Sequence, residues 1–411
     1  MNRRVVVTGI GLITPLGTGN DESWESLRAC KSKVRSVDFL NPDEFKSRIA
    51  AAIPCFDPLD YMAPKRAKRL DRFSQLSVAS SKLALENAGL TITDENREKI
   101  GINLGSALGG VGYGEAQHNK YFNGGLKAVD PMIALSVFGG AGATNAAIEF
   151  GLQGPSMGNA NSCASGANAI GEAFHMIKRG EIDMMLAGGV EAPLAPMIFG
   201  GFSLIRALST RNDDPTHASR PFDAGRDGFV LGEAAAIVLL EDYEHAVNRG
   251  TEPIAEITGY AATNDAYNMI APRPDGSQAG RALAMTLDEA GISPDEVDYL
   301  NTHSTSTPLG DTAESLAIHN ALGERASTIP VSGTKGYYGH PLGASGAVEA
   351  ALMCLILQKG WLPPTLNMEN PDPDAPLNFV RGEGLEQSVE TVMSSALGFG
   401  GINTGMIFRR I

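Results

Sequence analysis

The stretch Gly158-Asn159-Ala160-Asn161-Ser162-Cys163-Ala164-Ser165-Gly166-Ala167-Asn168-Ala169 leads from a polar loop into a small-residue segment. The segment becomes amphipathic and predicts a helix over 165–179. Branched and apolar residues at 182–188 then predict a buried strand. This loop–helix–strand unit recurs along the chain, and its recurrence predicts an α/β fold.

Further units of the same kind lie on both sides of this one. Runs rich in branched residues and bounded by turn residues predict strands at 4–8, 100–105, 182–188, 235–241, 254–260, 297–302, 329–332, 392–396 and 404–408. Helices are predicted at 73–88, 165–179, 280–290, 312–322 and 344–358. This alternation favours helices layered on mostly parallel sheets.

A polar, charged stretch at 242–253 follows an apolar strand and predicts the domain boundary. It separates an N-terminal half, 1–250, from a C-terminal half, 251–411. Both halves share the same strand–helix rhythm, and in both a short polar loop precedes a small-residue helix. We therefore expect an internal duplication.

The charge of the chain excludes some classes of partner. The 33 basic and 47 acidic residues give a net charge of -14, which argues against nucleic acid. A local basic cluster could still receive an acidic partner; it consists of Lys65, Arg66, Lys68, Arg69 and Arg72.

The sequence also bears on cofactors and location. The four cysteines are far apart and no cluster has zinc spacing, so we expect reduced thiols and no structural metal. The glycines at 110–114 do not fit a dinucleotide loop. No apolar run reaches about 18 residues and no signal-peptide pattern follows Met1. We expect a cytoplasmic protein without a membrane span.

Cys163 is the strongest candidate nucleophile. It lies where the loop enters the helix, and unpaired N–H groups and the positive end of the helix dipole stabilise a thiolate there. This position predicts a lowered thiol pKa. The alternative is a buried structural cysteine, which is the interpretation that we adopt for Cys30, Cys55 and Cys354.

Two histidines occupy loops of matching kind. His303 follows a predicted strand, in Asn301-Thr302-His303-Ser304-Thr305, and His340 lies in Gly339-His340-Pro341, before the next helix. Strand ends in α/β sheets are where sites are built. Together with Cys163, the two histidines predict a Cys/His/His site.

Glu349 lies in a helix that is apolar almost all round, so a partner for its carboxylate is expected. Lys335 is the natural candidate. Glu314, on the helix after the His303 loop, is a second carboxylate that could hold this lysine, and the alternative stays open.

The cysteine loop and the two histidine loops together resemble the β-ketoacyl-[acyl-carrier-protein] synthases, the condensing enzymes of fatty-acid and polyketide synthesis. The likeness runs from Val5-Val6-Val7-Thr8-Gly9 to Gly398-Phe399-Gly400-Gly401 and includes Ser219-Arg220-Pro221-Phe222-Asp223. It implies a thiolase-like fold of two duplicated α/β halves in five layers, α-β-α-β-α. It also implies decarboxylative condensation of malonyl carrier protein with an acyl group on Cys163.

The resemblance further implies a role for each matching position. Cys163, His303, His340 and Lys335 match the catalytic set, with Glu314 or Glu349 as support for the lysine. Phe399 matches the gating phenylalanine, whose N–H would complete an oxyanion hole with that of Cys163. Other matching positions are the arm-binding Thr305 and Thr307, the acyl-pocket Leu108 and Phe202, and the carrier-docking Lys65, Lys68, Arg69 and Arg206.

The same resemblance implies no metal or nicotinamide, substrates carried on the phosphopantetheine of an acyl carrier protein, and a homodimer. The sequence departs from the family's commonest form at Thr302-His303-Ser304 and at Gly336-Tyr337-Tyr338. These departures leave open an alternative, the active ketosynthase subunit of a polyketide or polyene heterodimer with a chain-length factor.

Overall fold

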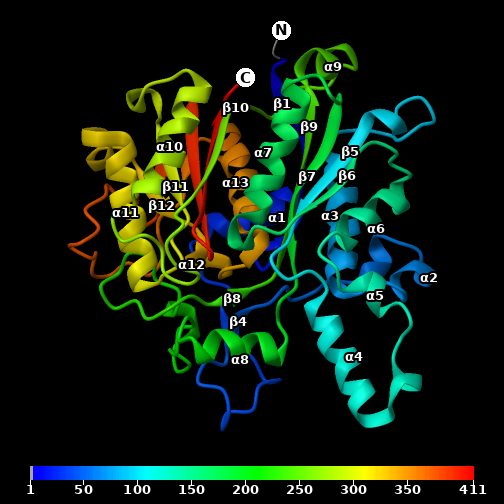
Figure 1. Cartoon of the computed structure of the whole chain (residues 1–411). Coiled ribbons are helices and arrows are strands. Elements are labelled where there is room, and N and C mark those ends of the chain that lie inside the picture. Colours follow the sequence, from blue (N-terminus) through cyan, green and yellow to red (C-terminus); the bar gives the residue numbers. More distant parts are fainter. Residues whose placement is uncertain (1–2) are drawn as a thin grey trace.

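The computed structural model describes residues 3–411 as mixed α/β layers around a large central sheet (Figure 1). The strands are β1 Val5–Thr14, β2 Gly17–Thr18, β3 Arg35–Ser36, β4 Ile49–Ala51, β5 Ile100–Gly105, β6 Ser156–Asn159, β7 Met184–Glu191, β8 Leu231–Gly232, β9 Ala234–Asp242, β10 Ala255–Asn264, β11 Tyr299–Thr302, β12 Val331–Gly333, β13 Trp361–Leu362, β14 Leu385–Glu386, β15 Thr391–Gly398 and β16 Ile402–Arg409.

The helices are α1 Asn20–Arg28, α2 Pro64–Ala67, α3 Arg72–Asn87, α4 Val111–Gly124, α5 Ile133–Ser136, α6 Ala141–Phe150, α7 Ser165–Lys178, α8 Pro196–Leu204, α9 Tyr243–Asn248, α10 Ser277–Ala290, α11 Pro308–Leu322, α12 Lys335–Tyr338 and α13 Ser345–Lys359. Each strand and helix range predicted from the sequence overlaps one of these elements, and 100–105 coincides with β5.

The strand order repeats between the two parts of the chain. In space the order is β6-β5-β7-β9-β1 in the first part and β12-β11-β15-β16-β10 in the second, and β1 pairs with β10 where they meet. Each set runs from its third strand through its second, fourth and fifth to its first. This repetition supports the proposal that 1–250 and 251–411 are duplicated halves.

The prediction of mostly parallel sheets is wrong. Within the central sheet of residues 3–411, only β5 with β6 and β7, and β11 with β12 and β15, pair in parallel. By contrast, β1, β9, β10 and β16 pair antiparallel to their neighbours. Strands covered on both faces are continuously apolar whatever their direction, so the pattern does not reveal direction.

Successive residues of a strand enter different layers of the core. On β9, Ala236, Val238 and Leu240 join the cluster that contains α7 and α13, while Ile237 and Leu239 join the cluster that contains α3 and α6. The strands of the second half pack on α10 and α11 on their other side. The layers are therefore α3/α6, sheet, α7/α13, sheet and α10/α11.

The central helices α7 and α13 lie unusually close together. A Cβ on Gly346 would lie 2.7 Å from the Ala167 Cβ, and a Cβ on Gly166 would lie 2.9 Å from the Ala347 Cβ. These two reciprocal contacts require glycine because no side chain fits between the helices.

One helical run among residues 3–411, Leu342–Lys359, is long and apolar enough to cross a membrane, with mean hydropathy 1.3. The expectation that no apolar run reaches about 18 residues is therefore wrong, because this run has 18 residues. However, 89% of the run is buried in the protein, because α13 is sandwiched between the two halves of the sheet.

We expect Gly346→Ala to lower the free energy of unfolding by about 1–3 kcal/mol, because the new methyl overfills the α7–α13 contact. The matched control is Gly201→Ala in α8, where no atom lies within 4 Å of a new Cβ. It should gain up to about 1 kcal/mol from helix propensity. Urea unfolding measures both, and a Gly346→Ala protein as stable as the control would contradict the packing argument.

Candidate active site

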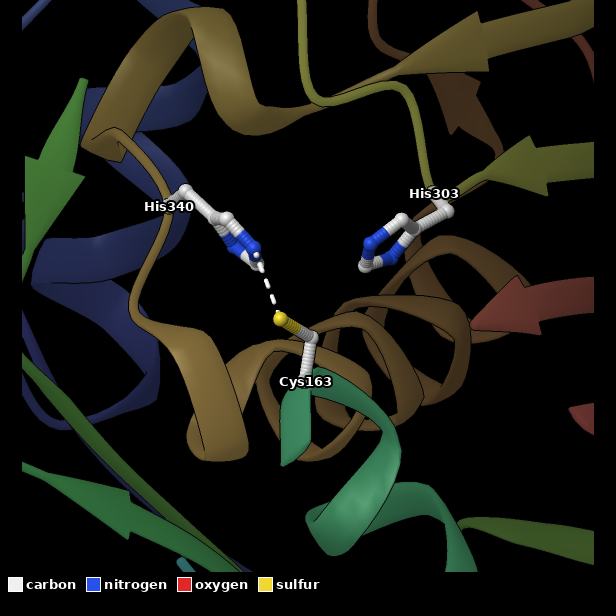
Figure 2. A group of neighbouring side chains, drawn as sticks. All are labelled: Cys163, His303 and His340. Atoms are coloured by element: carbon white, nitrogen blue, oxygen red, sulfur yellow. Dashed lines mark hydrogen bonds between the residues drawn. The ribbon is translucent and has the colours of Figure 1, made fainter. Parts of the chain in front are cut away.

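Three loops from both halves bring Cys163, His303 and His340 together, as Figure 2 shows. Cys163 lies in a 3₁₀ turn immediately before α7, His303 follows β11, and His340 lies between α12 and α13. One ligand atom from each residue lies within 4.8 Å of the other two, and all three side chains are buried. The predicted clustering of these residues is confirmed.

His340 contacts the thiol directly. Its Nε2 lies 3.2 Å from the Cys163 Sγ, and its Nδ1 lies 2.9 Å from the Ser345 Oγ (Figure 2 draws the first contact). Because Ser345 is the first residue of α13, the start of that helix fixes the imidazole plane. The ring is thereby aimed at the sulfur.

His303 is fixed from the opposite side by Lys335. The Lys335 Nζ donates to the His303 carbonyl oxygen at 2.6 Å and lies 3.4 Å from the His303 Nδ1. The same ammonium forms a buried ion pair with Glu349. A lysine that donates to Nδ1 leaves the proton of a neutral imidazole on Nε2, which faces the cavity.

The structure decides between the two candidate partners of Lys335: Glu349 is the ion-pair partner and Glu314 is not. Glu314 instead accepts from the backbone N–H groups of His303, at 2.6 Å, and Ser304, at 2.8 Å, and from the Ser395 hydroxyl. Ser304 has φ of 40°, a left-handed conformation that is strained for serine. Glu314 therefore stabilises the turn that orients His303.

Both imidazoles are neutral at ordinary pH. Burial holds the pKa of His303 well below 6.5, and the charges of Lys335 and His340 lower it further. Burial and the Lys335 ammonium lower the pKa of His340 in the same way. Each ring can therefore donate one N–H without carrying a charge.

The predicted lowering of the thiol pKa is wrong for the unacylated site. Burial raises the pKa of the Cys163 thiol, and the nearby Glu191 charge adds to this rise. The Ser162 hydroxyl, the Phe399 N–H and the Lys335 charge act in the opposite direction but are weaker than burial. The resting group is a thiol next to a neutral imidazole, which can accept its proton.

A pocket opens above the sulfur and contains several of the expected substrate contacts. Cys163, His303, His340, Thr305, Thr307 and Phe399 all line it. The Thr305 and Thr307 hydroxyl oxygens lie 3.0 Å apart, so they can act together on one polar group. The Phe399 N–H also reaches the sulfur, as an oxyanion-hole donor would.

Leu108 and Phe202 lie in the apolar cluster that also contains Cys163. The Phe202 ring stacks on Phe399, with centroids 6.3 Å apart and planes at 24°. Leu108 borders a second, open cavity of about 400 Å³ between α4 and α8. Leu108 and Ile198 line this cavity and also pack in the apolar cluster that contains Cys163, so the cavity borders that cluster.

The basic residues divide into two groups. Lys65, Lys68 and Arg69 are exposed on or beside α2, and Arg206 is exposed after α8. Figure 1 shows α2 and α8 well apart. Arg66 and Arg72 of the cluster form ion pairs with Glu149 and Glu233 within the chain, so they are less free to meet a partner.

Sequence reasoning missed two residues that hold the site. Ser345 orients His340, and Glu191 receives hydrogen bonds from two of the loops. Glu191 ends the apolar run of β7, and a carboxylate directly after a fully buried strand was the available signal.

The thiol and the two imidazoles could together hold a thiophilic ion such as zinc, since all three are metal ligands. The Lys335 ammonium next to His303 opposes a cation there. The other cysteines lie outside this cluster, and none offers a second thiol.

We expect Lys335→Met to raise the thiol pKa, because Lys335 supplies the charge that lowers it. The pH profile of Cys163 alkylation should move to higher pH. Removing one partner of the buried ion pair should also cost about 3–5 kcal/mol of stability. Lys178→Met, which removes a pairing with Glu289 outside this site, is the control. An unchanged alkylation profile in the folded Lys335→Met protein would contradict this electrostatic role.

Comparison with known proteins assigns the family. Residues 2–246 match the model described as "Beta-ketoacyl synthase, N-terminal domain", and residues 254–369 match "Beta-ketoacyl synthase, C-terminal domain". A relative from Synechocystis sp. named 3-oxoacyl-[acyl-carrier-protein] synthase 2 is 40% identical over 408 residues, covering 99% of this chain and 98% of its own.

Comparison with solved structures supports the same family assignment. A ketosynthase described in complex with its type II polyketide synthase acyl-carrier protein and bound to the hexaketide matches with TM-score 0.93 and 32% identity. The ishigamide ketosynthase/chain length factor matches with TM-score 0.92 and 30% identity. Both cover 100% of each chain, so the fold is thiolase-like. This chain therefore belongs to the β-ketoacyl synthase family.

Proposed function

We propose that this chain condenses malonyl-acyl carrier protein with an acyl group held on Cys163, releasing CO2 and a β-ketoacyl carrier protein. The observation that carries the proposal is one buried thiol next to two neutral imidazoles in a pocket with adjoining apolar space. Membership of the family, whose relatives are named 3-oxoacyl-[acyl-carrier-protein] synthases, supports it.

Acyl loading uses Cys163 and His340. The imidazole accepts the thiol proton across the 3.2 Å contact, and the sulfur attacks the thioester carbonyl. The carbon–sulfur bond to the carrier arm breaks, and the arm leaves as a thiol after receiving the proton that His340 took from Cys163. The N–H groups of Phe399 and Cys163 are the proposed donors to the oxyanion.

Condensation uses both imidazoles as donors. Malonyl carrier protein loses CO2, and the electron pair of the broken carbon–carbon bond remains as an enolate. The Nε2–H group of His303 stabilises the enolate oxygen, and so does that of His340 once the single proton of its neutral ring lies on Nε2 rather than Nδ1. Each donor contributes about 3–4 kcal/mol. The enolate carbon then attacks the acyl-Cys163 carbonyl, and the thiolate leaves. Neutral rings suit this step because they are ready donors.

We propose that the substrates are carried on phosphopantetheine and that no metal or nicotinamide takes part. Thr305 and Thr307 would bind amide groups of the arm, since their hydroxyls line the pocket above the thiol. Lys65, Lys68, Arg69 and Arg206 would dock the carrier, because these exposed cations have no ion-pair partner among residues 3–411. The free state of the four cysteines is consistent with a cytoplasmic location.

We propose that the chain pairs with a related subunit through β6 and the surface between α4 and α6. The opposite sheet edge, β12, is covered because Val331 bonds with Asn378 and Val380. Within residues 3–411, no backbone segment bonds to the outer edge of β6 in this way, and exposed edges favour pairing. Large apolar side chains are exposed on the segment from α4 to α6, which precedes β6 in the chain: Tyr121, Phe122, Leu126, Met132, Leu135, Phe138 and Ile148.

A second copy of this chain is our first choice of partner. The alternative is a chain-length factor, with this chain as the active ketosynthase of a polyketide or polyene pathway. The match to a ketosynthase/chain length factor structure supports retaining that alternative.

We expect Cys163→Ala to abolish acyl transfer, since no other thiol lies in the site. Intact-mass analysis after mixing with acyl carrier proteins of graded chain length should show one acyl group on the unaltered protein and none on the variant. Condensation should fall by about a thousandfold or more. Cys55→Ala, at an exposed cysteine, should behave as the unaltered protein. Undiminished condensation by Cys163→Ala would overturn the proposal.

We expect the protein to be dimeric and Phe122→Asp to weaken the dimer. Phe122 is 82% exposed on the proposed interface, where a charge would have to be desolvated. Leu204→Asp, at an equally exposed site on α8 (86%), is the matched control. Native mass spectrometry of the complex from its own cell gives one subunit mass or two. A monomer, or an interface insensitive to Phe122→Asp, would contradict the proposed pairing.

A further inference from the structure

The carboxylate of Glu191 joins two segments that reach the site from different halves of the chain. Glu191 is the last residue of β7 and is completely buried. Its Oε1 accepts from the Ser106 hydroxyl at 2.9 Å and from the Leu108 N–H at 3.2 Å. Its Oε2 accepts from the Ala107 N–H at 2.7 Å and from the Gly343 N–H at 2.9 Å.

Burying this carboxylate lowers the stability of the fold. Glu191 has no ion-pair partner in the part of the chain that the structure describes, although a buried carboxylate is usually paired with a cation. Burial raises its pKa to about 7, while the four donors act in the opposite direction. An uncharged amide offers only one acceptor oxygen, so a carboxylate is needed to accept from these donors on both of its oxygens.

The first segment that Glu191 holds is a wall of the apolar pocket. Ser106 to Leu108 follows β5, and the Leu108 side chain packs in the cluster that contains Cys163 and Phe202. A chain bound in this pocket would press on Leu108. Because the Leu108 N–H is bonded to Glu191, a shift of this wall reaches the carboxylate.

The second segment orients His340. Gly343 lies midway between His340 and Ser345, the residue that holds the imidazole. A Cβ on Gly343 would lie 2.3 Å from the Ala107 N and 2.7 Å from the Glu191 Oε2, so the two segments and the carboxylate are in direct contact. A movement of one segment therefore displaces the other.

We propose that Glu191 is a positioning residue that couples occupancy of the acyl pocket, through Leu108, to the alignment of His340 on Cys163. The inference rests on the proposed function, because it presupposes an acyl group on Cys163. It adds a reason for substrate-dependent activity: an acyl group that fills the pocket sets the imidazole for condensation, and a short one does so incompletely.

Glu191→Gln is the variant that tests this coupling. The amide NH2 must replace one oxygen, and at either position it faces a backbone N–H that needs an acceptor. An NH2 at the Oε1 position deprives the Leu108 N–H of its acceptor, and an NH2 at the Oε2 position deprives the Ala107 and Gly343 N–H groups of theirs. In either orientation the segment from Ser106 to Leu108 loses at least one bond to residue 191. We expect kcat for condensation to fall about tenfold to a hundredfold, as misplacement of a reacting group does, with KM for malonyl carrier protein nearly unchanged.

Chain-length dependence gives the specific readout. Acyl-Cys163 enzymes loaded with butyryl or lauroyl groups are compared in single-turnover condensation. We expect the unaltered protein to condense the lauroyl group faster and Glu191→Gln to lose most of that difference. A merely structural role would lower both rates by the same factor.

A second readout uses the charge of Glu191, which raises the thiol pKa. The other titratable groups around the thiol and its pocket remain in the variant; they are Lys335, His303, His340, Glu314, Asp265 and Asp311. Removing the carboxylate charge should therefore move the pH profile of Cys163 alkylation to lower pH.

Two further variants keep the test decisive. Glu241→Gln alters another fully buried carboxylate, at the opposite end of the β7–β9 pair, and should lower stability without changing the alkylation profile or the chain-length dependence. Ser106→Ala removes one donor and leaves the carboxylate, so it should shift the chain-length dependence in the same direction by a smaller factor even if Glu191→Gln fails to fold.

The outcomes separate the inference from the function it rests on. An unaltered protein that does not condense any acyl group overturns the proposed function. If the unaltered protein condenses but Glu191→Gln or Ser106→Ala keeps its full chain-length dependence, the coupling through Glu191 is wrong. Loss of that dependence in these variants and not in Glu241→Gln supports it.

Discussion

The site depends on the close contact between α7 and α13 at the centre of the molecule. The two helices come this close because Gly166 and Gly346 have no side chain at the crossing. Cys163 lies two residues before α7, and His340 lies five residues before α13. The close approach of the two helices therefore places the Cys163 sulfur 3.2 Å from the His340 imidazole. One half of the chain supplies the nucleophile, and the other supplies both histidines.

Burial in this central layer has opposite effects on the groups of the site. It keeps the two imidazoles neutral, which makes them N–H donors for an enolate, but it also raises the thiol pKa. Lys335 opposes burial at the thiol, where its charge favours the thiolate, and adds to burial at the rings, where its charge disfavours the imidazolium. The lysine is itself maintained in the interior by Glu349. The charge states of the thiol and of the two imidazoles therefore depend together on burial and on the Lys335–Glu349 ion pair.

Much of this could be predicted from the sequence, and the limits have physical causes. Periodicity located β5 and α7 because local patterns determine them, and the loop positions of Cys163, His303 and His340 indicated one site. Strand direction could not be predicted, since the antiparallel β9 is as continuously apolar and buried as a parallel strand. The predicted pKa of Cys163 was wrong because the start of a helix can be recognised in the sequence, whereas the complete desolvation of the thiol cannot. Glu191 was missed because its partners are backbone groups of distant loops.

The most direct test of the central claim is the charge of the two imidazoles in the folded protein. NMR of isotope-labelled histidine, titrated from neutral to acidic pH, reports the protonation of each ring, and His303→Ala and His340→Ala assign the signals. The account predicts that both rings remain neutral well below pH 6.5, the ordinary histidine pKa. Protonation of either ring near pH 6.5 would contradict it, because an imidazolium in the resting site is incompatible with the desolvated, lysine-flanked arrangement described above.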